Sequence, residues 1–302
     1  KLNPKYMTMI IPSRWFSGGL GLDEFRTEML SDDRIKEIHD FPDASDCFPG
    51  VEIKGGVNYF LWSKEYHGDC KIVTHKNGKI VSSSERPLLE DGMETFVRNN
   101  EIISILRKVS AFNERSFSTI VGSYDPFGFD VREKNSYKRV RIPFTTTKSD
   151  DCYELYYNGW RKDGVGYVKK NLINKGQDMT DEIKVLFPKA WGAGDYTKDW
   201  LKPFCVGKNT CCTETYLVVG PFDSAEKAEN CISYTQTRFF HLLVSLIKIT
   251  QNTMQGAYEK VPMQDFSKSW TDEELYEKYG LTDEEIEFIE SAIWPDKFKE
   301  EK

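Results

Sequence analysis

Residues 46–62, DCFPGVEIKGGVNYFLW, join a turn to an apolar strand. Phe48 stands directly before Pro49 and Gly50, a pair that is typical of a turn. Residues 57–62 are mostly apolar with alternating faces, and we expect a strand there. A large aromatic ring in a loop forgoes the free energy gained by burial. Phe48 is therefore expected either to fill the core or to be held for a flat partner to stack on.

The residues before this stretch predict two more strands and a helix. The run MTMII at 7–11 is ended by Pro12, which indicates a buried strand. Residues 22–30 place their apolar side chains on one helical face, and IKEIHDF at 35–41 alternates as a strand. The beginning of the chain therefore reads as strand, helix, strand, loop and strand, which is a crossover followed by a return strand.

The pattern after residue 70 is mixed. Residues 95–111 predict a helix, and many short strands separated by turn signals follow it. Residues 224–251 predict two helices, the first of them capped by Ser224. The end, at 271–294, predicts two short helices that each open with a Thr-Asp-Glu-Glu capping box.

Composition excludes several classes of protein. The chain has 302 residues, of which 39% are hydrophobic, so wholesale disorder is not expected. The sequence contains no run of 18 apolar residues, so we expect no segment that crosses a membrane. The seven scattered cysteines indicate reduced thiols in a cytoplasmic protein, and without a C-x-x-C pair we expect no metal site. The chain begins at Lys1 rather than at a Met, which we interpret as a fragment or a processed chain.

The net charge of −7 is unevenly distributed. Residues 271–302 hold 12 acidic and 4 basic residues, whereas residues 98–148 hold 10 basic and 5 acidic residues. A basic region on a nearly neutral body with an acidic tail is compatible with DNA binding. It is equally compatible with an ordinary solvated surface.

Several segments resemble one family of enzymes. MTMIIPSRWF, IKEIHDF and CFPGVEIKGGVNYFLW resemble the closing segments of the catalytic domain in adenine-specific DNA methyltransferases of bacterial restriction-modification systems. CCTETYLVVGPF, TRFFHLLVSLIKITQN, VPMQDF and TDEELYEKYGLTDEEIEFIE look like the target-recognition domain and tail of large type II members. The resemblance covers nearly the whole chain, and the order of the motifs is a stronger signal than any one of them.

The resemblance implies a fold and a set of domains. Residues 1–67 would be an α/β fragment, the last strands of a Rossmann-like methyltransferase sheet. Residues 68–270 would form an α+β target-recognition domain for double-stranded DNA, and residues 271–302 a short, acidic helical tail. In the family the strand at 7–11 is flanked on one side by the returning strand and on the other by the strand that leads into the catalytic motif. Since that second neighbour is missing here, we expect a sheet of three strands in the order 35–41, 57–62, 7–11, with 7–11 as an open edge.

The resemblance also implies what lies outside the chain. The S-adenosylmethionine loop and the catalytic Asn-Pro-Pro-Tyr motif of the family would precede these segments. LNPKY at 2–6 stands directly before the first strand and has Lys5 in place of the second Pro, so we do not interpret it as that motif. We therefore expect no catalytic, cofactor-binding or metal-binding residues here. S-adenosylmethionine would bind to a missing N-terminal half, on the same or a separate polypeptide.

The candidate site residues follow from the same resemblance. Phe48 and Pro49 match the position that stacks on the flipped adenine, since a base taken out of the helix loses its stacking partners. Positive and aromatic side chains near loops suit phosphates and grooves, and amides suit adenine. The candidate DNA contacts are Arg132, Arg139, Arg141, Trp160, Arg161, Lys189, Lys248, Gln251 and Asn252.

Two alternative functions remain open. A stand-alone DNA specificity subunit without catalysis would also lack the front half, and it would have no catalytic partner. A small-molecule methyltransferase or other Rossmann-like enzyme is the second alternative, and about 200 residues after the sheet are too many for a lid. Among the single residues, Gln251 and Asn252 could equally cap the preceding helix.

Overall fold

The computed structural model describes residues 3–16, 21–133, 139–191, 201–247 and 252–293. It shows a mixed α/β protein with several sheets and helices. The chain divides into two compact units, Lys1–Arg107 and Lys108–Lys302. The division falls within helix α2 (Asn100–Ala111), so the first unit is longer than the residues 1–67 expected from the sequence.

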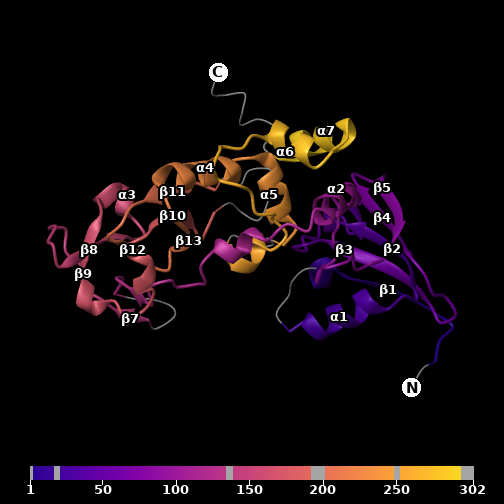
Figure 1. The fold of residues 1–302 in the computed structure, drawn as a ribbon. Helices are drawn as coiled ribbons and strands as arrows, with labels where there is room; N and C mark the ends of the chain where they lie inside the picture. The colour runs from indigo at the N-terminus through magenta and orange to yellow at the C-terminus, as the bar shows by residue number, and fades with distance from the viewer. Residues whose placement is uncertain (1–2, 17–20, 134–138, 192–200, 248–251, 294–302) are drawn as a thin grey trace. The chain divides into compact units, whose positions relative to one another are not determined.

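The first unit is built on a five-stranded sheet with the strand order β1-β3-β2-β4-β5 (Figure 1). β3 lies between β1 and β2 and is antiparallel to both, whereas β2 and β4 are parallel. The three strands expected from the sequence thus lie in the predicted order, with β1 at an edge. The elements of this unit are β1 (Tyr6–Pro12), α1 (Asp23–Ser31), β2 (Ile35–Phe41), β3 (Val57–Ser63), β4 (Cys70–Lys76) and β5 (Lys79–Arg86).

The expectation of a three-stranded sheet is wrong, because β4 and β5 extend it. The two strands form a hairpin whose turn holds Asn77 at φ 53° and Gly78 at φ 70°. Asn-Gly is the pair that this left-handed turn favours, since both residues adopt positive φ at low cost. The hairpin then continues the sheet because β4 pairs with β2.

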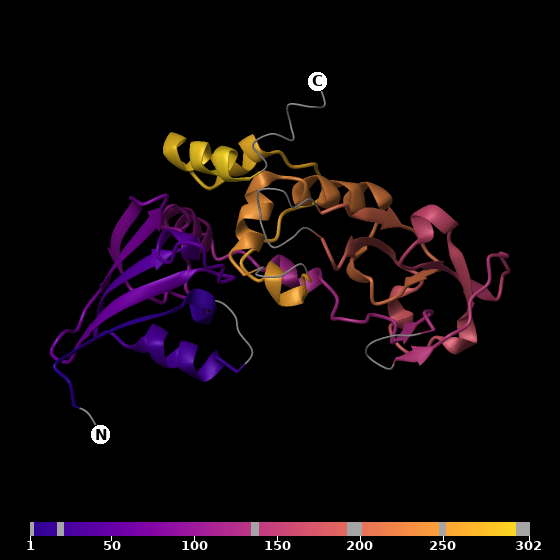
Figure 2. The ribbon, with the colours of Figure 1, turned by 180° about the vertical axis from the view of Figure 1, so that it is seen from behind.

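The two faces of this sheet differ in their cover. Helix α1 and the turn after β1 lie along one face (Figure 2), where alternate side chains of the strands are buried. The core of this face is formed by Trp15, Phe16, Leu30, Ile35, Ile38, Phe60, Cys70, Ile72, Leu88 and Phe96. On the opposite face, His39 stacks on Tyr59 and Phe41 stacks on His75, and all four rings remain partly exposed.

The second unit holds three small sheets. Their strand orders are β11-β10-β13, β12-β8-β9 and β6-β7. A cluster of buried residues that includes Leu155, Leu186 and Val218 joins the first two sheets. The strands are β6 (Phe129–Asp130), β7 (Val140–Arg141), β8 (Cys152–Tyr156), β9 (Gly166–Lys169), β10 (Ile183–Pro188), β11 (Phe204–Val206), β12 (Thr210–Cys212) and β13 (Tyr216–Phe222).

Helices α4, α6 and α7 of the second unit pack on α5. The side chain of Ser224 caps α4 and that of Thr237 caps α5, and both capping boxes of the tail are present, as the sequence predicted for Ser224 and the tail. α6 and α7 pack on α5, and Phe239 of α5 stacks on Tyr279 at 4.9 Å. The tail therefore belongs to the second unit. The helices are α3 (Trp160–Asp163), α4 (Ala225–Thr235), α5 (Arg238–Ser245), α6 (Asp272–Lys278) and α7 (Asp283–Ala292).

Candidate nucleic-acid interface

The loop between β2 and β3 holds Phe48 at the surface. A short turn at Ala44–Asp46 begins the loop, and the N–H of Phe48 donates to the carbonyl of Ala44 at 2.8 Å. The carbonyl of Phe48 in turn accepts from the N–H of Val51 at 3.0 Å. The ring of Phe48 is an exposed apolar group, with 37% of the residue accessible. Phe48 therefore does not fill the core, which was the alternative explanation for an aromatic residue at this corner.

Local contacts explain why this loop is ordered. Gly50, after the exposed Pro49, has φ +79°, a conformation that other residues rarely adopt. The side chain of Asp46 accepts a hydrogen bond from the N–H of Asn77 at 2.8 Å, which ties the loop to the β4–β5 hairpin. Phe48 and Pro49 are thus presented by a supported loop.

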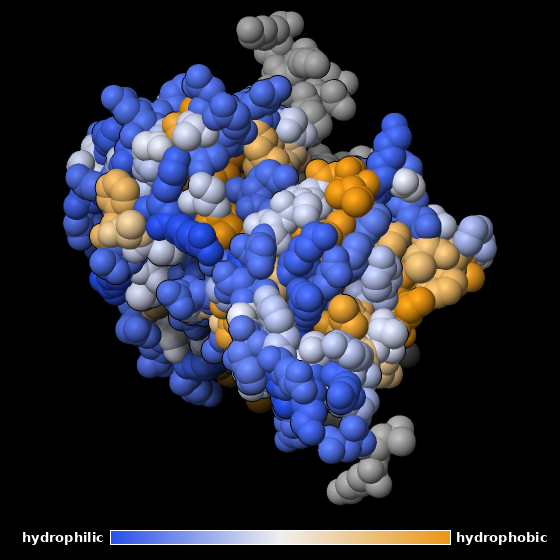
Figure 3. All heavy atoms as spheres, turned by 90° about the vertical axis from the view of Figure 1, so that its right-hand side faces the viewer, coloured by the Kyte–Doolittle hydropathy of each residue, from blue (hydrophilic) through white to orange (hydrophobic). Residues whose placement is uncertain are grey.

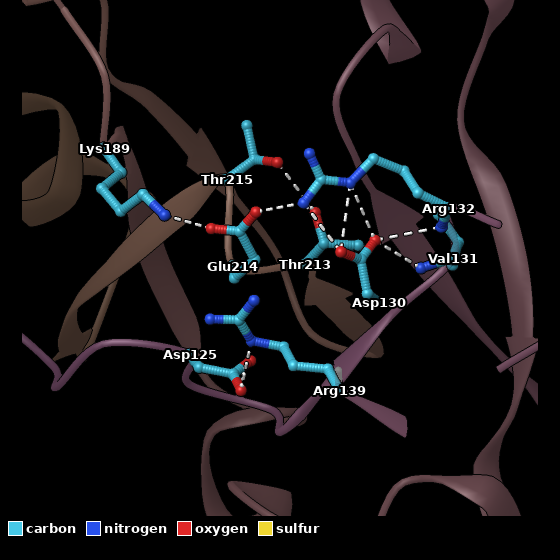
Figure 4. Close-up of polar contacts among 9 residues, drawn as sticks. All are labelled: Asp125, Asp130, Val131, Arg132, Arg139, Lys189, Thr213, Glu214 and Thr215. Atoms are coloured by element: carbon cyan, nitrogen blue, oxygen red, sulfur yellow. Dashed lines mark hydrogen bonds and ion pairs between the residues drawn. The ribbon is translucent and has the colours of Figure 1, made fainter. Parts of the chain in front are cut away.

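A cluster of charged side chains lies in the second unit, where three segments of the chain approach one another (Figure 4). Asp130 ends β6, Lys189 follows β10, and Glu214 precedes β13. Arg132 donates from Nε and Nη2 to Asp130, and from Nη2 to Glu214 at 2.5 Å. Glu214 also accepts a hydrogen bond from Lys189. Two candidate DNA contacts, Arg132 and Lys189, are therefore brought together by one carboxylate.

Burial and pairing have opposite effects on Asp130. Burial would raise the pKa of this carboxyl group, but the hydrogen bonds from Arg132 outweigh burial and lower the pKa. The same hydrogen bonds raise the pKa of Arg132. Arg132 keeps 43% of its side chain exposed, so it is a held but accessible guanidinium.

Arg139 and Lys189 are placed differently from Arg132. Arg139 pairs with Asp125 at 2.9 Å and only 7% of its side chain is exposed. Lys189 is buried, and both cations lie 4.6 Å from the centre of the Tyr124 ring. Their positive charges are enclosed and paired with carboxylates, so these two residues are poorly placed to contact phosphates.

Arg141, Trp160 and Arg161 lie at the surface of the same unit. The side chain of Arg141 is 55% exposed and its Nη2 lies 3.5 Å from Glu133. Trp160 packs against the core and donates from Nε1 to the hydroxyl of Tyr216 at 2.8 Å. The guanidinium of Arg161 lies 4.8 Å from the centre of the Trp160 ring. Trp160 therefore lies at the edge of the core, where an exposed arginine covers part of its ring.

The remaining three candidates follow α5 in the sequence. Lys248 and Gln251 fall outside the described residues. Asn252 is exposed, and its backbone forms a bridge with Ala190. The next residue, Thr253, donates its N–H to the carbonyl of Lys189. The chain after α5 thus passes beside the charged cluster.

The basic excess of residues 98–148 is largely matched by carboxylates. Each of five cations in this region forms an ion pair of 2.5–2.9 Å with an acidic side chain. These cations are Arg98, Arg107, Lys108, Arg132 and Arg139. A basic stretch of sequence therefore does not translate into an equally basic surface.

Four residues of these networks were not singled out from the sequence. Asp130 and Glu214 hold Arg132, and Arg98 holds Asp40 near the Phe48 loop. The spacing of Asp130 and Arg132 is a local signal that could have been noticed. Glu214 and Asp40 lie 82 and 58 residues from their arginine partners, and a single sequence carries no signal for such pairs.

Neither a cluster suited to a metal ion nor a helix suited to crossing a membrane occurs in the part of the chain that the structure describes. No group of three or more His, Cys, Asp or Glu side chains in it could hold a metal ion. None of its helices is long and apolar enough to cross a membrane. The seven cysteines are free thiols, five of them buried.

Comparisons with known proteins found one family profile, in the first unit, and one relative. Residues 1–48 match the profile of the family described as "Eco57I restriction-modification methylase". A protein of Mycoplasma pneumoniae described as "Uncharacterized adenine-specific methylase" is 40% identical over 112 residues. That match covers 35% of this chain and 25% of the relative. These matches confirm the resemblance to adenine-specific methylases of restriction-modification systems.

Two solved structures show a weaker overall likeness. The type IIG restriction endonuclease BpuSI has a TM-score of 0.35 at 12% identity, over 97% of this chain and 45% of that protein. The type IIL restriction-modification enzyme MmeI, solved in complex with DNA, has a TM-score of 0.39 at 9% identity, over 84% of this chain and 37% of that protein.

Proposed function

We propose that this chain recognises DNA and supports the flipped base in an S-adenosylmethionine-dependent adenine DNA methyltransferase of a restriction-modification system. The match of residues 1–48 to a methylase family and the adenine-specific relative support this proposal. Catalysis requires a further segment that supplies the cofactor site and the reacting groups. That segment belongs either to the same polypeptide or to a separate one.

Phe48 carries the proposal. It ends the segment that matches the family, and its ring is exposed on a supported loop. A flipped adenine loses its neighbours in the stack, and an aromatic ring restores about 1–3 kcal/mol per base. Phe48 would stack on one face of the adenine, and Pro49 would fix the direction from which the ring approaches.

The open edge of the first sheet supports a second segment. β1 is apolar on both faces, which is typical of strands that lie inside a sheet. Yet Met9 and Ile10, which point to opposite faces, are 49% and 53% exposed. Apolar surface is visible in several places on the face of the molecule drawn in Figure 3. A catalytic half that adds a strand beside β1 would cover this surface and satisfy the outer backbone groups of β1.

The described residues do not fit S-adenosylmethionine. In open α/β sheets, ligands bind beyond the carboxyl ends of the strands, where an acidic side chain holds ribose hydroxyls. β1 and β2 end at the same edge, and the buried acid there is Asp40. Its oxygens already accept from Ser13 at 3.1 Å and from Arg98 at 2.5 and 2.7 Å. We therefore propose that the cofactor is bound by the catalytic half and not by residues 1–302.

The second unit would provide the DNA contacts. Arg132, Arg141 and Arg161 have exposed guanidinium groups, which suit phosphates and guanine edges. Asn252 is exposed on the same unit and suits an adenine edge. Lys248 and Gln251, which precede it, remain candidates, whereas Arg139 and Lys189 would support the interface from beneath.

A methyl-transfer assay with separated parts tests the proposal. The 302-residue chain, a polypeptide that carries the proposed catalytic segment, and their mixture would each be incubated with duplex DNA and S-adenosylmethionine carrying a labelled methyl group. We expect label in DNA adenine from the mixture alone. Methyl transfer by the 302-residue chain alone would overturn the division of labour. DNA binding by the chain with no transfer by the mixture would instead favour a specificity subunit without catalysis.

A further inference from the structure

The loop that carries Phe48 is closed at its base by contacts around one buried carboxylate. Asp40 stands one residue before the end of β2 and is fully buried. Ser13, which follows β1, donates its hydroxyl to Asp40, and Asn58 of β3 donates its amide to Ser13 at 3.0 Å. Three strand ends are thereby joined by hydrogen bonds beneath the loop.

Arg98 links the two ends of the loop directly. Its Nε and Nη2 donate to the two oxygens of Asp40 at 2.5 and 2.7 Å. The same Nη2 donates to the carbonyl of Gly55, at the other end of the loop, at 2.8 Å. One guanidinium therefore holds the segment that leaves β2 and the segment that enters β3.

The position of Arg98 is itself fixed. The buried residues Phe96 and Val97 precede it, and the N–H of Phe96 donates to the carbonyl of Phe16. Asn99, the next residue, accepts from the N–H of Glu101 and so orders the start of α2. The guanidinium is presented by a rigid backbone, which is a condition for a side chain that positions another element.

The two chain ends of the loop also approach closely at Gly56. A Cβ atom there would lie 2.1 Å from the carbonyl oxygen of Phe41, and Gly56 has φ +75°. Close packing at this point leaves little freedom for the loop as long as Asp40 and Gly55 are held. Loss of the guanidinium would leave the buried carboxylate of Asp40 without its cation, and the base of the loop would open to hydrate it.

We propose that Arg98 is a positioning residue for Phe48: it clamps both ends of the 42–56 loop and so sets the place where the aromatic ring meets a flipped base. The role of the ring rests on the proposed function. The clamp itself acts on the loop whether or not DNA is bound, so the two can be tested separately.

Thiol labelling of Cys47 tests the clamp. Cys47 is half-buried beside Phe48, and Cys205 is the other half-buried thiol, so a Cys205→Ser background leaves Cys47 as the accessible one. Under native conditions Arg98→Gln should raise the labelling rate of Cys47 about tenfold, since a lost charged hydrogen bond shifts an opening equilibrium by about that factor. Arg98→Lys, which keeps the charge, should give an intermediate rate.

Arg107→Gln is the matched control. Arg107 makes the same kind of two-pronged contact, with the buried carboxylate of Glu90, at 2.9–3.1 Å. It does not touch the 42–56 loop through any of these bonds. The control should leave Cys47 labelling unchanged. Equal rates for wild type and Arg98→Gln, or equal acceleration by both variants, would overturn the clamp.

A fluorescent base separates the clamp from the role of Phe48. The probe is a duplex with one 2-aminopurine opposite an abasic site, whose fluorescence falls when the base stacks on a ring. Phe48→Ala should abolish the quenching by the chain, and Arg98→Gln should weaken it while DNA affinity stays the same. Quenching that persists in Phe48→Ala would contradict the proposed function. Quenching that Phe48→Ala abolishes but Arg98→Gln leaves intact would overturn the positioning role.

Discussion

Phe48 and Phe60 have the same side chain but differ in their exposure to solvent. Phe60 of β3 is buried in the core under α1, whereas Phe48 is exposed. Phe60→Ala should lower the free energy of unfolding by about 3–5 kcal/mol, because it leaves a cavity. Phe48→Ala should lower it by less than about 1 kcal/mol. If the proposed function holds, Phe48→Ala should weaken transition-state binding in the complete methyltransferase by about 1–3 kcal/mol, the contribution of one stacked base.

Urea denaturation and kcat/KM for methyl transfer would measure the two effects. Phe48→Trp is the matched variant, since it keeps an aromatic face. A large loss of stability in Phe48→Ala would mean that the ring serves the fold after all.

Arg139 and Arg141 are two residues apart and provide a second contrast. Arg139 is enclosed with Asp125, and Arg139→Ala should cost about 3–5 kcal/mol of stability by leaving a buried charge unpaired. Arg141 is exposed, and Arg141→Ala should change stability by about 0–1 kcal/mol. If Arg141 contacts a phosphate, its loss should reduce the slope of log K against log salt by about 1.

Denaturation and fluorescence anisotropy over a range of salt concentrations would check both statements. If the affinity of the wild-type chain for duplex DNA does not change with salt concentration, contacts to phosphates are contradicted in general. A loss of stability in Arg141→Ala as large as that in Arg139→Ala would show that exposure does not separate the two residues.

Lys184 gives a pH-dependent contrast. It is fully buried on β10, and burial lowers the pKa of its ammonium group from 10.5 to about 8. Between these two values the unfolded chain binds a proton that the folded chain does not, so the stability of the wild type rises with pH through this window. The full effect is roughly 3 kcal/mol, at about 1.4 kcal/mol for each pKa unit.

Lys184→Met removes this titration while keeping the volume. The variant should be the more stable protein at pH 7, and its advantage should shrink between pH 8 and 10.5. Burial raises the pKa values of Cys211 and Cys212 above this window in the folded protein, so these thiols titrate there only in the unfolded chain, which both proteins share. A stability difference that does not change with pH would show that Lys184 is charged throughout.

At the scale of elements, the two Thr-Asp-Glu-Glu boxes allow another matched test. Asp272 and Asp283 hold the same position, directly after the capping threonine of α6 and α7. Asp272 also accepts hydrogen bonds from the N–H groups of Arg238 and Phe239, at the start of α5. Asp272→Ala should therefore cost about 2–4 kcal/mol, because two N–H groups lose their partner. Asp283 is exposed, and Asp283→Ala should stay within about 0.5 kcal/mol.

Thermal and urea unfolding of the two variants would measure the difference. Equal effects would mean that the tail packs on α5 less firmly than these bonds imply. Removing residues 271–302 would uncover α5, so a loss of DNA binding after such a deletion would report unfolding.

Local signals account for what could be predicted from the sequence. The boxes at Thr271 and Thr282 and the cap at Ser224 were predicted because the residues of a cap lie within one turn of each other. The Asn77-Gly78 turn is an equally local signal that was not recognised, and with it β4 and β5 were placed outside the first sheet.

Burial and pairing could not be predicted in the same way. Whether Arg139 is enclosed and Arg141 exposed depends on Asp125 and Tyr124, which a fold brings near one arginine and not the other. Glu214 is 82 residues from Arg132. The residue types at a site can thus be listed from a sequence, whereas the charge they present to DNA depends on partners that only tertiary packing supplies.

The two edge strands of the first sheet, β1 and β5, differ in how polar their side chains are. β5 has exposed Ile80 and Val81 at its start but continues as serines, Glu85 and Arg86, so its edge is polar over most of its length. β1 is apolar throughout except for Thr8. Exposed polar and charged residues discourage a further strand from pairing, and β1 lacks them.

For the whole molecule, this asymmetry predicts association through β1. The backbone groups on its outer side and its exposed apolar side chains form a template for another strand, and a second copy of the chain offers the same template. We therefore expect the 302-residue chain to self-associate at micromolar concentration. The catalytic half should compete with this self-association, because both would use the same edge.

Lysines placed on β1 test this prediction. Met9→Lys combined with Ile10→Lys puts a charge on each face of the strand at residues that are already exposed, so the fold should persist. The double variant should be monomeric in sedimentation velocity, and its mixture with the proposed catalytic half should no longer transfer methyl groups. The control, Ile80→Lys combined with Val81→Lys on β5, should behave like the wild type. Self-association that persists in the β1 double variant but is lost in the β5 double variant would place the contact at the β5 edge. The exposed apolar residues of β1 would then lack the partner that we propose for them.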